Sequence, residues 1–220
     1  MAAPTRLPSG GSTTRRSRPE RIGAARASLG AAPRSSTIRA MHPRLAEIAT
    51  YLEETRAAVV RAVEHLSPED AARRPGPEAW SVDEILTHLS LVEPGVAKRI
   101  AKSVGKAKGE GLERETSVAS VLGSLDGAAF EILREKQVAP EFVEPKAILS
   151  LPEALAALAR SRESLRHAMG EADGWALETV VAPHPRLGTI DMYQWLVFLG
   201  AHERRHLAQI ERTIAAITAP

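Results

Sequence analysis

The feature that most constrains this chain is a set of apolar stripes that repeat every three or four residues. Leu, Ile and Val recur with this spacing over residues 42–66, 81–100, 150–170 and 189–217. The period places apolar side chains along one face of a helix, where they need a partner surface. No segment shows the alternation of a convincing strand. The sequence therefore predicts an all-α antiparallel four-helix bundle.

Composition agrees with a helical, globular chain without a membrane span. Hydrophobic residues make up 44% of the 220 residues, charged residues 25% and aromatic residues only 4%. An abundance of Ala, Leu, Glu and Arg favours helix over sheet. Since no stretch has 18 uncharged apolar residues, we expect no membrane partner and a cytoplasmic location. The absence of cysteine excludes disulfides, thiolate metal sites and cysteine nucleophiles.

Local signals predict where the helices begin and where they are interrupted. Ser81 and Ser150 each stand three residues before a glutamate, which is the pattern of a capping box. Pro94, followed by glycine, should kink or break the second helix. Residues 102–111 are expected to form a polar loop, and residues 174–188 are expected to be irregular.

A weaker stripe over residues 117–136 predicts one extra helix in the connection between bundle helices 2 and 3. The connection as a whole, residues 105–149, is a candidate for the mouth of a site, together with the loop around His184. A homodimer formed through exposed apolar residues of the extra helix stays open.

The first 40 residues differ sharply from the rest. They hold eight arginines and one acid, with much Ser, Gly, Pro and Ala, which predicts a disordered tail before a bundle domain at 41–220. We favour Met41 as the true initiator, because ordered pattern begins directly after it. A transit peptide and a tail that touches nucleic acid are the alternatives. Residues 41–220 carry a net charge of −5, which argues against a nucleic-acid-binding domain.

Three of the seven histidines fall on inward helix faces. His202 and His206 continue the stripe of the last helix one turn apart, so both imidazoles can reach one ion. His88 lies on the inward face of the second helix. Three imidazoles from two helices suit a divalent transition metal and leave a coordination position open, as in catalytic zinc sites. We predict one ion per chain, with Zn, Ni and Fe all compatible.

The alternative interpretation is a set of ordinary core residues. A short motif such as His-x-x-x-His arises by chance, and a histidine on an apolar face is usually hydrogen-bonded within the core. Trp80, Trp195 and Tyr193 could line a site, but aromatic residues on stripes more often pack the core. Arg204 and Arg205 are expected to be solvated surface charges.

HERRH, residues 202–206, also matches the zinc-protease signature H-E-x-x-H. One protease class continues with a glycine and a third histidine, but Gln209 and Arg212 hold those positions. Too few residues follow for a glutamate ligand on a later helix. The third ligand must come from upstream, and Glu203 is expected on the helix surface or behind a ligand rather than as a general base.

Two segments carry a family resemblance: WSVDEILTHLSLVE, residues 80–93, and HPRLGTIDMYQWLVFLGAHERRHLAQIER, residues 184–212. In the first, a tryptophan precedes a helix with one histidine. In the second, His-Pro and Leu-Gly precede a helix in which Gln-Ile follows His-x-x-x-His. With the order of helices over 42–217, these segments resemble the DinB-like superfamily of small metal-binding bundles. The resemblance places the family's three-histidine site on His88, His202 and His206.

The resemblance implies a fold and a metal more than a reaction. Such proteins include transferases and isomerases that use low-molecular-weight thiols, and metal-dependent hydrolases. We therefore expect a small-molecule substrate, with thiol transfer as the first hypothesis and hydrolysis as the alternative. A non-catalytic stress or scaffold protein is a further alternative. An enzyme should leave the ion open to a pocket, whereas a scaffold should bury it or cap it with a side chain such as Glu93.

Overall fold

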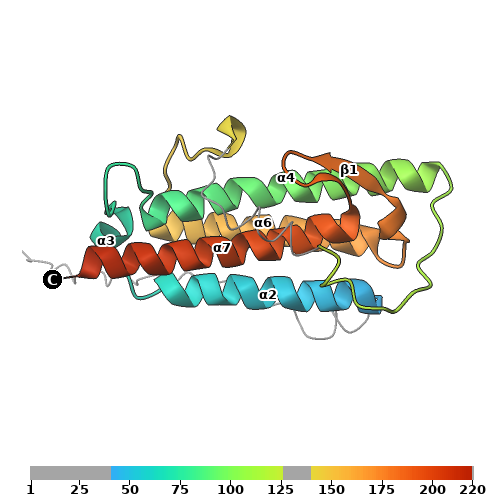
Figure 1. Cartoon of the computed structure of the whole chain (residues 1–220), viewed down its shortest axis with the longest axis horizontal. Coiled ribbons are helices and arrows are strands. Elements are labelled where there is room, and N and C mark those ends of the chain that lie inside the picture. The colour runs from blue at the N-terminus through green and yellow to red at the C-terminus, as the bar shows by residue number, and fades with distance from the viewer. Residues whose placement is uncertain (1–40, 126–139, 220) are drawn as a thin grey trace, which may run out of the picture.

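A computed structural model of the chain describes residues 41–125 and 140–219 (Figure 1). Four long helices form the body, and the all-α four-helix bundle predicted from the sequence is confirmed. They are α2 (Pro43–Val63), α4 (Val82–Gly109), α6 (Leu151–Ala172) and α7 (Met192–Thr218). Shorter elements are α3 (Pro68–Ala72) and the 3-10 turns η1 (Glu141–Val143) and η2 (Leu177–Thr179). The predicted tail, residues 1–40, lies outside the described residues.

The four helices run in both directions along the bundle. Helices α2 and α7 share one direction, and α4 and α6 share the other (Figure 1). The core reflects this arrangement, because Val59 and Ile210 from the later parts of α2 and α7 cluster with Leu86 and Leu151 from the starts of α4 and α6. The long connection between α4 and α6 returns the chain to the other end of the bundle, which allows these two helices to be parallel.

Capping boxes begin three of the helices and orient the chain as it enters them. The Ser81 side chain accepts a hydrogen bond from the Glu84 backbone at the start of α4, and the capping box predicted at Ser150 starts α6. At α7 the Asp191 side chain plays this part with Gln194. Each box pairs backbone groups that the first helical turn would otherwise leave without partners.

The predicted break of the second helix at Pro94 and the predicted loop over residues 102–111 are wrong. Helix α4 continues through Pro94 to Gly109 as one element. Pro94 and Gly95 both lie on the exposed side, whereas Ile100 and Val104 beyond them are buried. Burial of that later stripe against the bundle outweighs the hydrogen bond that proline removes.

Only part of the segment predicted as an extra helix, residues 117–136, lies within the described residues. Residues 117–125 contain no helix, and residues 126–139 lie outside the described part of the chain. Val121 and Leu125 are nevertheless buried in the bundle core. These apolar residues therefore belong to a segment that packs against the helices without being helical itself.

The expectation that no strand forms is also wrong. Residues predicted to be irregular contain a small antiparallel hairpin of β1 (Val181–His184) and β2 (Gly188–Asp191). In its register His184 is opposite Gly188, whose positive φ of 71° serves the turn. The hairpin ends directly at α7 and places His184 near that helix. Two short strands with a proline and a single buried alternation give too weak a pattern to be seen in the sequence.

Close contact of α2 and α7 depends on Gly200. A Cβ atom at this position would overlap the ring of Tyr51. Because glycine has no side chain, the two helices can approach each other closely at this point, which is two residues before His202. Among the described helices, none combines the length and the apolar character that crossing a membrane requires.

Candidate metal centre

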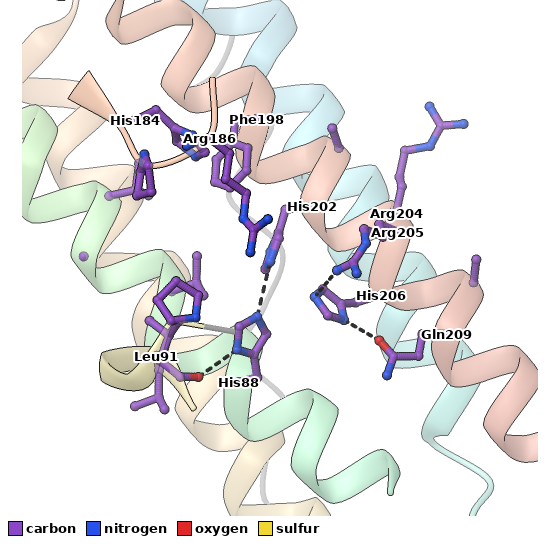
Figure 2. Close-up of a pocket in the computed structure, with 18 of the residues that line it drawn as sticks. His88, Leu91, His184, Arg186, Phe198, His202, Arg204, Arg205, His206 and Gln209 are labelled. Carbon is purple, nitrogen blue, oxygen red and sulfur yellow. Dashed lines mark hydrogen bonds between the residues drawn. The ribbon is translucent and has the colours of Figure 1, made fainter. Parts of the chain in front are cut away.

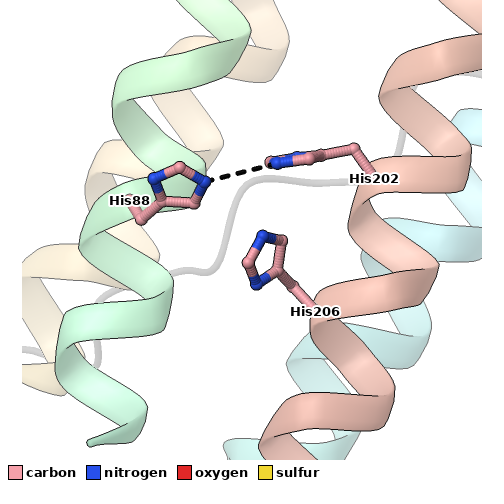
Figure 3. Close-up of side chains that lie close together, drawn as sticks. All are labelled: His88, His202 and His206. Carbon is pink, nitrogen blue, oxygen red and sulfur yellow. Dashed lines mark hydrogen bonds between the residues drawn. The ribbon is translucent and has the colours of Figure 1, made fainter. Parts of the chain in front are cut away.

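The structure brings the three predicted histidines together between α4 and α7 (Figure 3). His88 comes from α4, and His202 and His206 come from successive turns of α7. All three are buried, with 4%, 9% and 3% of their surfaces exposed. The ring of His88 lies 5.2 Å from that of His202 and 4.9 Å from that of His206, centre to centre. The inward faces identified from the stripes therefore converge on one point.

Hydrogen bonds orient two of these rings. The Nδ1 of His88 lies 2.7 Å from the carbonyl oxygen of Val143, in η1. A carbonyl oxygen only accepts, so His88 carries its proton on Nδ1 and directs the lone pair of Nε2 toward His202. The Nδ1 of His206 makes the same kind of bond to Oε1 of Gln209, at 2.9 Å. Histidine ligands of metals are typically held in this way by a partner at the other ring nitrogen.

The spacing of the nitrogens fits a transition metal. The Nε2 atoms of His88 and His202 are 3.3 Å apart. Two nitrogens at about 2.0–2.1 Å from an ion, at a tetrahedral angle, are separated by about 3.3 Å. The three ligand atoms all lie within 4.8 Å of one another. The residues present can therefore hold one ion, and the three-histidine donor set leaves its identity open among Zn, Ni and Fe.

Burial keeps these imidazoles neutral. It lowers the pKa of His88. Burial, together with the repulsion that protonated His206 and His88 would exert, lowers the pKa of His202 well below its ordinary value. Burial, His88 and Arg205 lower the pKa of His206 to about 3. Neutral imidazoles offer the lone pairs that a metal needs. The guanidinium of Arg205 already lies 3.2 Å from Nε2 of His206, so an ion would displace it from that nitrogen.

The histidines form part of the wall of a cavity of about 1520 Å³ (Figure 2). Both regions named as candidates for its mouth contribute to it, His184 from the hairpin and Val143 from the long connection. Trp80 and Trp195 also line it, while Tyr193 does not. The Tyr193 hydroxyl instead donates a 2.8 Å hydrogen bond to Glu115.

Comparison with known proteins places the chain in a family. A family model described as the DinB superfamily matches residues 51–210. The chain belongs to the DinB superfamily. It is also 28% identical over 150 residues to YuaE, an uncharacterized protein of Bacillus subtilis, covering 66% of this chain and 84% of that relative. The crystal structure of TT2238, a four-helix bundle protein, matches with a TM-score of 0.52 and 21% identity, covering 76% of this chain and 98% of that one, and shows the fold.

In this DinB-superfamily protein Glu203 is neither on the surface nor directed at the histidines. It is 4% exposed and accepts hydrogen bonds from Arg56 at 2.7 Å and from Arg162 at 3.0 Å. Thr55 donates a further bond of 2.6 Å to the same carboxylate. The alternative that placed Glu203 on the helix surface is therefore wrong. A carboxylate held by two arginines is also unsuited to act as a protease general base.

Glu93 completes this buried group and does not cap the histidines. Its carboxylate accepts hydrogen bonds from Arg162 at 2.7 Å and from Arg56 at 2.9 Å. Ser161 donates to the same side chain. One charged residue from each long helix thus forms what we call the four-helix ion cluster: Arg56, Glu93, Arg162 and Glu203.

The sequence does contain a pattern that indicates this cluster. Each of its members falls on an apolar stripe; for example, Arg162 lies four residues after Leu158 and three before Leu165, both buried. A charge on an apolar face predicts a buried partner of opposite sign. Which helix supplies that partner is not visible from spacing.

Proposed function

We propose that this chain holds one divalent transition metal on His88, His202 and His206 and acts as a metal-dependent enzyme on a small molecule. Transfer of a low-molecular-weight thiol to an electrophile is the first candidate reaction. The observation that carries the proposal is the convergence of three neutral imidazoles from two helices on the wall of a large cavity. A bound ion supplies Lewis-acid chemistry there, because it lowers the pKa of a thiol or a water that binds to it.

The chain's own residues would position and shield the reacting groups. Val143 and Gln209 accept hydrogen bonds from the ligand histidines and keep their Nε2 atoms turned inward. Phe198 packs against the ring of His202, with centres 5.4 Å apart, and Trp80 packs against His88 at 5.2 Å. These aromatic faces exclude water from one side of the histidines and offer an apolar surface to a substrate.

Catalysis is favoured over a scaffold role by the surroundings of the histidines. A scaffold should enclose the ion or supply a fourth side chain, and Glu93 was the candidate. That carboxylate is engaged by Arg56, Arg162 and Ser161. The histidines border a cavity instead, so a substrate can reach them.

Thiol transfer is favoured over hydrolysis by the absence of a poised base among the described residues. Hydrolysis requires a group that takes the proton of the attacking water. The carboxylates that line the described cavity wall are those of Glu78 and Glu144, and both residues are exposed. The imidazole of His184 also lines it, but its Nδ1 already accepts hydrogen bonds from the backbone N–H groups of Arg186 and Leu187. A thiol, with a lower pKa than water, needs less help to ionise. Hydrolysis of an ester or amide remains the second candidate.

Elemental analysis of protein purified without chelator tests the metal site. We expect about one divalent ion per chain in the native protein and none after joint His202→Ala and His206→Ala substitution, because one imidazole cannot hold the ion alone. His167→Ala is the matched control, since His167 is exposed on α6, and it should keep the ion. Circular dichroism verifies that the variants remain helical. Equal metal in the native and doubly substituted proteins would disprove the site.

The same proteins test the reaction. The metal-loaded native chain is assayed for transfer of small thiols to electrophiles and then for hydrolysis of esters and amides. Turnover should be absent in the doubly substituted protein, and added metal should not restore it. A rate that is equal in the two proteins would exclude a role for the ion.

A further inference from the structure

Among the described residues that line the cavity is a fourth histidine, His184, for which the proposed function has no use. It ends β1, whose side chains alternate between exposed and buried, and it takes the last buried position. It lies outside the cluster of three candidate ligands. A buried polar side chain normally has hydrogen-bond partners, so both nitrogens of this ring need an explanation.

Backbone hydrogen bonds fix the position of the proton on this imidazole. The N–H groups of Arg186 and Leu187, in the hairpin turn, both donate to Nδ1 of His184 at 3.2 Å. A ring nitrogen that accepts carries no proton, so the neutral ring has its proton on Nε2. Burial and the charges of Arg99 and Arg186 lower the pKa of His184 to about 4, which keeps the ring neutral at pH 7. His184 is therefore a fixed N–H donor rather than a base.

This donor has no acceptor within the described part of the protein. No described residue accepts a hydrogen bond from Nε2 of His184. The nitrogen is not sealed from solvent, in contrast to the unpartnered indole N–H of Trp195 beside it. The turn explains only Nδ1, since the shorter side chain of an Asn or Asp could accept from the same N–H groups. The N–H on the other side of the ring is thus available to a ligand in the cavity.

The surroundings of His184 indicate what kind of ligand group suits this donor. Its ring lies 4.7 Å from that of Trp195 and 4.4 Å from that of Phe198, centre to centre. Phe198 in turn contacts His202, so the three rings lead toward the candidate metal centre (Figure 2). The guanidinium of Arg99 lies 4.6 Å from the centre of the Trp195 ring. An N–H donor near a positive charge stabilises an oxygen with negative character, and aromatic rings suit an apolar framework.

We propose that His184 is a substrate-binding residue that donates a hydrogen bond from Nε2 to a carbonyl or carboxylate oxygen of the substrate. The framework attached to that oxygen packs on Phe198 and Trp195 and extends toward His202. The cavity therefore takes a small apolar molecule with a carbonyl or carboxylate group. The inference rests on the proposed function, which places a substrate in this cavity, but the hydrogen bond itself requires no metal ion.

NMR spectroscopy of the full chain with isotopically labelled histidines tests the donor directly. The signals of His184 are identified by their loss in the His184→Asn variant. In the native protein they should show the Nε2–H tautomer from about pH 5 to pH 8, because the ring protonates only at lower pH. A ring protonated on Nδ1 would overturn the inference.

Three probes of similar shape test the ligand group, with and without prior treatment with chelator. Acetophenone has a carbonyl oxygen, benzoate has a carboxylate, and α-methylstyrene has a CH₂ group in place of the carbonyl oxygen. At least one oxygen probe should shift the Nε2 resonance of His184 and bind about threefold or more tightly than α-methylstyrene, as expected for one hydrogen bond. The tighter of the two identifies the preferred group. Equal affinity for all three probes would refute the hydrogen bond.

The His184→Asn variant separates ligand binding from support of the turn. Its side-chain oxygen can still accept from the turn N–H groups, but its amide is too short to replace Nε2. The preference for the oxygen probe over α-methylstyrene should therefore disappear. His167→Asn, at an exposed histidine of α6, is the matched control and should keep the preference. An unchanged preference in His184→Asn would overturn the inference, and the titration of the native protein decides the matter should this variant fail to fold.

Failure of the two proposals can be told apart. Chelator-treated native protein should still prefer the oxygen probe, because His184 is not a candidate ligand of the ion. Absence of metal from the native protein together with this preference would refute the metal centre alone. Metal at one ion per chain without the preference would refute the role of His184 alone.

Discussion

Arginine has two different environments in this molecule. In the four-helix ion cluster, Arg56 and Arg162 each contact both Glu93 and Glu203, and all four residues are buried. In the cavity, arginines outnumber the described acidic lining residues. The first set is closed, since every charge is matched within the bundle. The second set borders a space of about 1520 Å³.

The two sets contribute differently to the stability of the bundle. A closed buried cluster fixes the relative positions of four helices, because shifting any one of them leaves a charge without its partner in a medium of low dielectric constant. It lies between the two parts of the apolar core, at the level where α7 presents His202. The arginines at the cavity lie nearer the surface, where a charge contributes less to the stability of the fold. Removal of single charges from each set should therefore change the stability of the protein to different extents.

The largest effect is expected from Arg162→Met. This change leaves the carboxylates of Glu93 and Glu203 with one shared partner, and breaking a buried ion pair costs about 3–5 kcal/mol. Urea unfolding followed by circular dichroism measures the free energy of unfolding. Arg160→Met, on the exposed side of the same helix, should stay within about 0.5 kcal/mol of the native protein. Equal stability of the two variants would show that the ion cluster does not hold the helices.

A smaller effect that depends on pH is expected from Glu93→Gln, since the amide keeps the shape and loses the charge. Burial alone would raise the pKa of Glu93, but the charges of Arg56 and Arg162 and the hydrogen bonds from Ser161 and Arg162 outweigh it and lower the pKa below its ordinary 4.5. At pH 7 the variant should lose about 3 kcal/mol.

The sign of the pH dependence follows from this lowered pKa. The ionised carboxylate contributes its full stability above about pH 4.5, and the contribution is lost as the pH falls through the folded-state value. The difference between native protein and Glu93→Gln should therefore be constant above about pH 5 and shrink in acid. A difference that grows in acid would contradict the role assigned to this carboxylate.

The smallest effect on stability is expected from Arg205→Met in the cavity. The side chain is only partly buried, so its removal should change the free energy of unfolding by less than about 1 kcal/mol. Loss of stability comparable to that of Arg162→Met would mean that the two sets of arginines serve the same structural purpose.

Much of the fold could be predicted because helix formation has a local period. The stripes located all four long helices, and the capping box at Ser81 marked the start of α4. The errors arose where distant contacts override local preference. Pro94 does not end α4, since burial beyond it sustains the helix. The hairpin at 181–191 is set by its packing beside α7.

The candidate site was predictable in its residues but not in its surroundings. His88, His202 and His206 fall on inward faces, so their meeting follows from the bundle itself. Their hydrogen-bond partners do not follow, because Val143 lies 55 residues from His88 in a segment without helical period. The partners of Glu203 are likewise remote in sequence, with Arg56 147 residues away.

By itself the sequence determined four amphipathic helices and the three histidines that their inner faces share, since both depend on periods of three and four along a single helix. Which charges are enclosed and which border a cavity depends on the tertiary structure. That distinction depends on the packing of one helix against another, because an arginine forms a buried ion pair only where a neighbouring helix brings a carboxylate to it.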